Sequence, residues 1–89
     1  MRKLVYSGQF KKDVKLGKKR HYDMAKLEEI LNKLVNCEVL EPRYEDHPLQ
    51  GNYSTDRDCH IAPDWILIYS IVGDELRLIR TGTHSDLYK

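Results

Sequence analysis

The chain has 89 residues, and we expect residues 1–89 to form a single domain around one core. No apolar run approaches the roughly 18 residues that a membrane-spanning helix needs, and the apolar stretch after the basic residues 1–3 is too short for a signal peptide. We therefore expect a cytoplasmic protein with no membrane partner. In that reducing compartment Cys37 and Cys59, which form no CxxC pair or zinc-finger pattern, are expected to be free thiols.

The net charge of +1 conceals an asymmetry along the chain. Residues 1–35 hold ten Lys/Arg against four Asp/Glu, whereas residues 36–89 hold five against ten. The basic cluster, which falls within ten residues, consists of Lys11, Lys12, Lys15, Lys18, Lys19 and Arg20. Such a cluster can neutralise phosphates and anchor a nucleic acid without reading its sequence. A solvated helix face has the same composition, so both interpretations stay open here.

Residues 4–6 predict a short opening strand, and Ser7 after it can cap a helix. That helix carries Phe10 and Val14 on one side, and Gly17 marks its expected end.

Asp23 is the next expected helix cap. Behind it, apolar residues recur at the three-and-four spacing of an amphipathic helix: Met24, Leu27, Ile30, Leu31, Leu34 and Val35. Residues 36–53 contain two prolines and a glycine and show no period, so they predict a loop.

Three strands are predicted after this loop, over residues 57–61, 65–69 and 75–80. Turn-forming residues separate them at 62–64 and at 73–74. The expected order is therefore β-α-α-β-β-β. This is an α+β fold in which two helices pack on a small, mostly antiparallel sheet.

Polar residues are expected to meet at one rim of this sheet. His60 ends the first late strand, and Asp64 lies across the turn from it. Arg80 ends the last strand in phase with the leucines expected to face the core, and His84 follows four residues later. The antiparallel order returns these strand ends to the same rim, and His47 can arrive there on its loop.

This set fits the cleavage of RNA without a metal. A base must take the proton from the attacking 2′-hydroxyl, and an acid must protonate the leaving 5′-oxygen. Imidazoles suit both transfers because their ordinary pKa of about 6.5 leaves both forms available at neutral pH. The Arg80 fork suits the phosphate oxygens, and Asp64 beside His60 can fix the tautomer of that ring.

Other roles for these residues remain open on sequence alone. Each histidine can be a surface or capping residue, and Arg80 can form a structural ion pair. Trp65 can be a core residue or a platform that packs against a base. A metal site built from the histidines and Asp64 is chemically possible, but no short ligand spacing indicates one, so neither a metal nor a cofactor is expected.

Five motifs resemble those of the YafQ-type toxins of the RelE superfamily, over nearly the whole chain. They are residues 6–16 (YSGQFKKDVKL), 19–24 (KRHYDM), 46–51 (DHPLQG), 57–69 (RDCHIAPDWILIY) and 80–84 (RTGTH). The resemblance implies a fold like that of the microbial ribonucleases. It also implies a type II toxin that cleaves mRNA in the ribosomal A site without a metal. Its implied partner is a cognate antitoxin, usually of ribbon-helix-helix type, which alone contacts operator DNA.

The resemblance also implies roles for individual residues. The implied catalytic set is His47, His60, Asp64 and His84, with Arg80 on the phosphate and Tyr88 packing near the substrate. We expect His84 to be the general acid, His47 the general base, and His60 and Asp64 an electrostatic pair. Trp65 is kept as a second candidate for substrate packing.

The chain departs from the family pattern at two places. Tyr88 stands where a phenylalanine is common, and residues 52–56 stand where relatives tend to have a Trp and a Lys. A phosphate contact made there by relatives is expected either to be missing or to be made by Arg57. With a ribosomal substrate, the basic cluster is best interpreted as the surface that meets ribosomal RNA, or as a groove for an acidic antitoxin segment.

Two other functions fit the same residues. One is a ribonuclease of this fold that acts on free RNA, and the other is a non-enzymatic module that binds RNA or protein. Similarity of fold alone does not separate them.

Overall fold

The computed structural model describes residues 1–49 and 55–88. Its elements are β1 (Lys3–Tyr6), α1 (Gly8–Lys19), α2 (Met24–Val35), the short 3-10 helix η1 (Pro42–Tyr44), β2 (His47–Pro48), β3 (Asp56–Ala62), β4 (Trp65–Val72), β5 (Glu75–Gly82) and α3 (His84–Leu87). The expected α+β class is confirmed, and η1, β2 and α3 are additions to the expected order. No helix within this described part is long and apolar enough to span a membrane.

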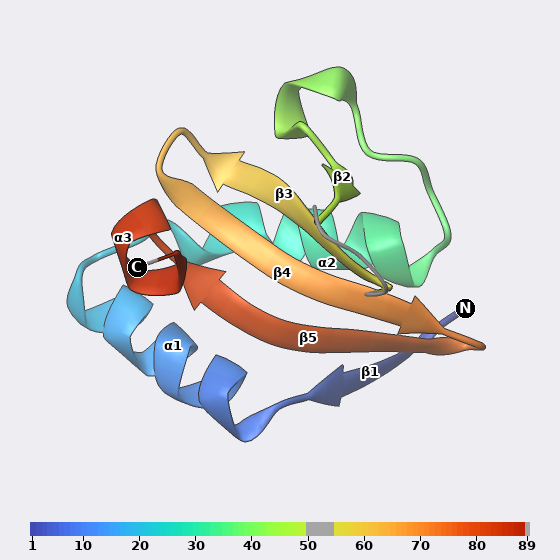
Figure 1. Cartoon of the computed structure of the whole chain (residues 1–89), viewed down its shortest axis with the longest axis horizontal. Coiled ribbons are helices and arrows are strands. Elements are labelled where there is room, and N and C mark those ends of the chain that lie inside the picture. The colour runs from blue at the N-terminus through green and yellow to red at the C-terminus, as the bar shows by residue number, and fades with distance from the viewer. Residues whose placement is uncertain (50–54, 89) are drawn as a thin grey trace.

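The described strands form one five-stranded sheet in the order β1-β5-β4-β3-β2 (Figure 1). β1 runs parallel to β5, and the other neighbours are antiparallel. α2 lies behind the sheet in this view, and α1 lies beside β5. β2 falls within the expected loop and lies at the sheet's edge, where Pro48 is tolerated because an edge strand does not need every N–H.

Both predicted helix caps are confirmed. The Ser7 hydroxyl accepts a hydrogen bond from the Phe10 amide, and the Asp23 carboxylate accepts one from the Ala25 amide. The expected end of the first helix at Gly17 is wrong, because α1 continues to Lys19. A Cβ at Gly17 would lie 3.0 Å from the Met24 side chain, so this glycine allows close packing rather than ending the helix.

One hydrophobic core joins the helices to the sheet. α2 contributes Leu27, Ile30 and Leu34, and α1 contributes Phe10. The sheet contributes the residues that alternate toward this side: Cys59, Leu67, Tyr69, Leu76 and Leu78. Ile66 and Ile68 are equally buried but lie outside this cluster, on the opposite face of the sheet. That second face is the one that carries the polar residues described below.

A β-bulge in β5 decides which face Arg80 occupies. Tyr69 of β4 pairs with Leu78, whereas the preceding Ile68 pairs with Arg80, so Ile79 is an extra residue in β5. The extra residue reverses the alternation. The expectation that Arg80 shares a face with the core leucines is therefore wrong: Arg80 lies on the opposite face.

Candidate active site

A row of paired residues crosses four strands on the face opposite the core. His47 pairs with Asp58, Asp58 with Ile68, and Ile68 with Arg80. Because neighbouring strands lie about 4.8 Å apart, the row brings the backbones of His47 and Arg80 to within roughly 14 Å. Ile68, which is 7% exposed, lies in this row between Asp58 and Arg80.

The adjacent row makes room for a helix above the sheet. His60 pairs with Ile66, and Ile66 with Gly82. A Cβ at Gly82 would lie 2.9 Å from the carboxylate of Asp86, so only glycine lets α3 approach this closely. α3 begins with a capping box in which the Thr83 hydroxyl and the Asp86 carboxylate each accept a backbone N–H of the other residue. The residues after β5 thus form a fixed turn of helix.

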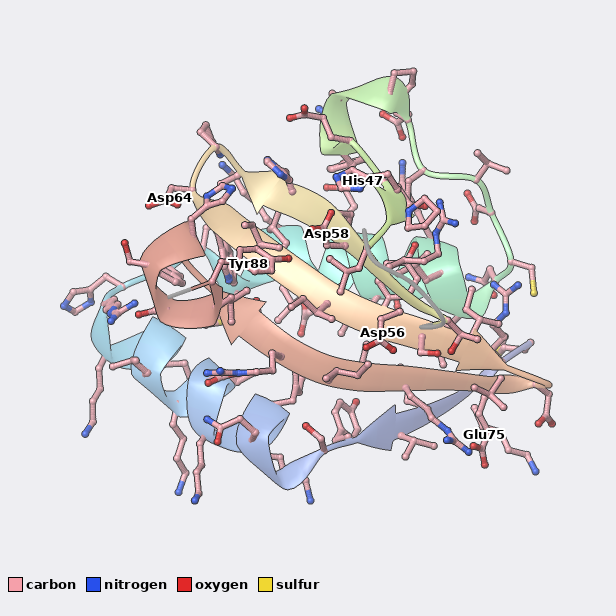
Figure 2. The ribbon with its side chains drawn as sticks, in the orientation of Figure 1. His47, Asp56, Asp58, Asp64, Glu75 and Tyr88 are labelled. Carbon is pink, nitrogen blue, oxygen red and sulfur yellow. The ribbon has the colours of Figure 1, made fainter. Side chains whose placement is uncertain are left out.

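α3 and the residue that follows it place two candidate residues, His84 and Tyr88, over this face. Figure 2 shows Tyr88 reaching from the end of α3 toward Asp58, with Asp64 at the turn between β3 and β4. The His84 ring centroid lies 5.6 Å from that of His60 and 6.1 Å from that of Tyr88. Of the residues predicted to meet at one rim, His60 and His84 are therefore neighbours, and Asp64 bonds to His84. Arg80 pairs instead with Asp13, and His47 pairs with Asp58.

His84 and Asp64 form a dyad. The His84 Nδ1 lies 2.9 Å from the Asp64 Oδ1, which also accepts the His84 backbone N–H at 3.1 Å. These two bonds lower the pKa of the Asp64 carboxyl, so it stays charged. A carboxylate on Nδ1 orients the ring and leaves Nε2 available for proton transfer. The expectation that Asp64 pairs with His60 is wrong, because its partner is His84.

The partner of His60 is Glu45, which follows η1 and has a left-handed backbone conformation. The His60 Nδ1 lies 3.4 Å from the Glu45 Oε2. His60 also lines a hollow of about 490 Å³ together with residues of α2 and η1, among them Lys26 and Tyr44. Two imidazoles, each with a carboxylate at Nδ1, therefore stand side by side.

His47 is held differently from the other two histidines. Its Nε2 lies 2.8 Å from the Asp58 Oδ1, and its Nδ1 lies 3.0 Å from the Pro48 carbonyl oxygen. Both neighbours are acceptors, so both ring nitrogens are engaged. Figure 2 shows His47 and Asp58 directed toward each other across β2 and β3.

Asp58 is one of the carboxylates that the sequence argument missed. It is 5% exposed, and its Oδ2 accepts a hydrogen bond from the Tyr88 hydroxyl at 2.8 Å. Burial, together with this bond to a carboxylate, raises the pKa of the Tyr88 hydroxyl. Asp58 lies two residues before His60 and therefore on the same face of the strand. This spacing could have predicted that Asp58 belongs to the site.

Arg80 is fixed by a carboxylate of α1. Its Nε and Nη2 each donate to Asp13 at 3.1 Å, and this pairing raises the pKa of the guanidinium. The side chain of Arg80 is 34% exposed, whereas that of Asp13 is 7% exposed. Arg80 thus forms a structural ion pair and also lies on the polar face of the sheet.

Three residues that were candidates for contact with RNA are engaged within the protein. Trp65 is 5% exposed and packs in the core with its ring centroid 4.8 Å from that of Tyr22, so of the two roles left open for it the core role is observed. Arg57 pairs with Asp46, and Arg20 pairs with Asp86. These carboxylates offset both arginine charges.

The five lysines of the basic cluster are all exposed on α1. The thiols of Cys37 and Cys59 are free, as predicted, and burial raises the pKa of Cys59. Over residues 1–49 and 55–88, no group of three or more His, Cys, Asp or Glu side chains is arranged to hold a metal ion. The departure predicted at residues 52–56 lies mostly outside the described residues, which omit 50–54.

Residues 2–89 match the model of a family described as "Bacterial toxin of type II toxin-antitoxin system, YafQ". The chain is 51% identical over 88 residues to the mRNA interferase toxin YafQ of Escherichia coli K12, which covers 98% of this chain and 96% of that relative. It is similar to a chain in the crystal structure of the E. coli DinJ-YafQ complex, with a TM-score of 0.93, 50% identity and full coverage of both chains. It also resembles a metal-bound toxin from Helicobacter pylori, with a TM-score of 0.93, 37% identity, and 99% and 100% coverage.

Proposed function

This chain belongs to the YafQ family of bacterial toxins of type II toxin-antitoxin systems, and we propose that it is an endoribonuclease that cleaves mRNA in the A site of the ribosome. The observation that carries the proposal is the pair of neighbouring imidazoles, His60 and His84, each with a carboxylate at Nδ1. Such a pair supplies a base and an acid to one phosphodiester.

The cleavage proceeds in one displacement. The Nε2 of His60 takes the proton from the 2′-hydroxyl, and the 2′-oxygen forms a bond to the adjacent phosphorus. The bond between phosphorus and the 5′-oxygen breaks, and that oxygen receives the proton from the Nε2 of His84. The products carry a 2′,3′-cyclic phosphate and a 5′-hydroxyl. Arg80 stabilises the charge that develops on the phosphate oxygens.

The sequence led us to expect His47 as the general base. We assign this role to His60 instead. Both nitrogens of the His47 ring face acceptors, so it must give up a contact before it takes a proton. The Nε2 of His60 makes no hydrogen bond within the described residues. His47 with Asp58 then fixes the far side of the site, where Tyr88 packs against the substrate.

Neither a metal nor a cofactor takes part in this mechanism. Proton-transfer groups and a guanidinium supply each step that a bound metal would otherwise assist. Because one relative is described as a metal-bound toxin, the metal content of the active protein has to be measured beside its activity.

The ribosome supplies what this small domain lacks. The proposed groups lie on an exposed face, since the side chains of His84 and Arg80 are 54% and 34% exposed, so we infer that another surface positions the mRNA. The exposed lysines of α1 provide the phosphate contacts for docking on ribosomal RNA. Ribosome-bound mRNA also places this activity in the cytoplasm.

The proposed partner in the resting cell is a cognate antitoxin. The E. coli relative is crystallised as a DinJ-YafQ complex, which supports an equivalent complex here. We propose an antitoxin of ribbon-helix-helix type that blocks the toxin and carries the only contact with operator DNA.

Purified toxin, mixed with one mRNA either free or bound to ribosomes, tests this function. We expect cleavage of ribosome-bound mRNA, at the A-site codon, and loss of it in His84→Ala. Equal cleavage of free mRNA would replace the ribosomal role by a general ribonuclease. Cleavage of neither substrate by a folded, antitoxin-free protein would favour a binding module and overturn the proposal.

A further inference from the structure

The buried side of α1 contains one carboxylate, Asp13. Phe10, Asp13 and Gly17 recur at helical spacing and are the buried residues of α1, while the lysines point outward. An ionised carboxylate in such a stripe is costly unless hydrogen bonds replace the water that it loses. The contacts of Asp13 therefore carry information about its role.

Four hydrogen bonds meet this carboxylate. Oδ1 accepts from Gln9 Nε2 and from Arg80 Nη2, and Oδ2 accepts from Arg80 Nε and from the Thr81 amide, all at 3.1 Å. A carboxylate has about four lone-pair sites, so its hydrogen-bonding capacity is filled. The Thr81 amide lies just beyond the part of β5 that pairs with β1, so Asp13 also completes the edge of this strand.

The direction of these bonds decides which part of Arg80 remains free. A guanidinium has five N–H groups, and Asp13 occupies one on Nε and one on Nη2. The edge formed by Nη1 and Nη2 is left to bind two oxygens of a phosphate. Without Asp13, the flexible arginine side chain has no fixed orientation, and ordering it would weaken its interaction with the substrate.

We propose that Asp13 is a positioning residue that fixes the guanidinium of Arg80 for the cleavage step. Asp13 does not contact the RNA and acts only through Arg80. The carboxylate also joins α1, which carries the docking lysines, to β5, which carries the catalytic arginine. This role rests on the ribonuclease function proposed above.

A double-mutant cycle separates positioning from a merely structural role. We expect Asp13→Asn to lower the rate of cleavage at saturating ribosomes by about tenfold to a hundredfold, the effect of misplacing a reacting group, with KM within about threefold. In the background of Arg80→Ala the same change should have no further effect on the rate, because contacting residues are not additive. Gln9→Ala, which leaves both bonds to Arg80 intact, is the matched control and should cleave like the wild type.

The order of the arginine is a readout independent of activity. The heteronuclear NOE of the Arg80 Nε–H is expected to be high in the wild type and in Gln9→Ala, and to fall in Asp13→Asn. An equally ordered Nε–H in Asp13→Asn overturns the proposed role of Asp13, whether or not the wild type cleaves mRNA. A wild type that cleaves no mRNA refutes the ribonuclease function but not this role. Normal cleavage by Asp13→Asn beside an active wild type refutes only the role of Asp13.

If Asp13→Asn does not fold, Arg80→Lys tests the same geometry. A lysine keeps the charge and can reach Asp13, but it lacks the planar fork that binds the carboxylate and a phosphate together. We expect its rate to lie near that of Arg80→Ala. A rate near that of the wild type would show that a held guanidinium is not required, and the proposal would be wrong.

Discussion

Asp58 joins two parts of the site that are far apart in sequence, so its replacement by Asn is the most informative single change. The variant has almost the same shape but no negative charge. The Tyr88 hydroxyl then donates to an amide oxygen or meets an amide N–H, and the Nε2 of His47 loses its ionic partner. We expect both a loss of stability and a loss of cleavage.

The size of the loss follows from the exposure of each partner. A hydrogen bond to a charged group contributes about 1.5–3 kcal/mol when the group is buried, as Asp58 is at 5% exposed. The His47 side chain is 52% exposed, so its contact counts as a surface ion pair of about 0–1 kcal/mol. We expect the free energy of unfolding to fall by about 2–3 kcal/mol, which for a domain of this size lowers the Tm by roughly 10–20 °C.

Urea denaturation and thermal melting of the purified toxin measure this change. Asp74→Asn, in the turn between β4 and β5, is the matched control because its side chain is 70% exposed. It should stay within about 0.5 kcal/mol of the wild type. If Asp58→Asn also stayed within this margin and cleaved at the wild-type rate, the link from His47 through Asp58 to Tyr88 would have no role.

Three further changes test other parts of the molecule. His84→Ala should fold and bind its antitoxin but lose about 10²–10⁴-fold in cleavage rate, and a rate within about threefold of wild type would exclude it as the acid. Replacing Lys11, Lys15 and Lys18 by Gln should flatten the salt dependence of ribosome affinity by roughly one log–log unit for each lost phosphate contact, with an unchanged rate at saturation; an unchanged slope would make this a solvated face or an antitoxin groove. The ion pair with Arg20 holds the pKa of Asp86 below its ordinary value of 3.8, so its contribution to stability is present above that pH and is lost as the pH falls further. Urea titrations between pH 5 and 3 should therefore show a shallower loss in Arg20→Gln than in the wild type, and parallel curves would contradict the role of this pair.

Much of the fold could be predicted because local rules determine it. The caps at Ser7 and Asp23, the amphipathic period of α2 and the three late strands each depend on neighbouring residues, and all are observed. The same applies to the convergence of His60 and His84, which follows from an antiparallel order.

The errors arose where one residue changes the geometry of many. The insertion of Ile79 in β5 reverses every later side chain, so simple alternation assigned Arg80 to the wrong face. Gly17 has the composition of a helix end but serves contact with Met24, which only the packing of two helices reveals. Trp65 has the chemistry of a stacking platform, and only its burial in the core excludes that use.

The carboxylate partners were the least predictable part of the site. Asp64 bonds to His84 although His60 is nearer to it in sequence. The reason is that α3 packs closely over Gly82 and so brings His84 to Asp64. Asp58 and Asp13 were not expected to take part, since each depends on a contact across many residues of sequence. Side-chain pairing between distant segments is fixed by tertiary packing and has no local pattern.

The chemistry of the cut ends tests the central claim most directly. Metal-free toxin, checked by elemental analysis, is incubated with mRNA on ribosomes, and both new ends are identified. If the 2′-hydroxyl attacks, with His60 as the base and His84 as the acid, one fragment carries a 2′,3′-cyclic phosphate and the other a 5′-hydroxyl. A 3′-hydroxyl with a 5′-phosphate, as attack by a metal-activated water would leave, would contradict the account.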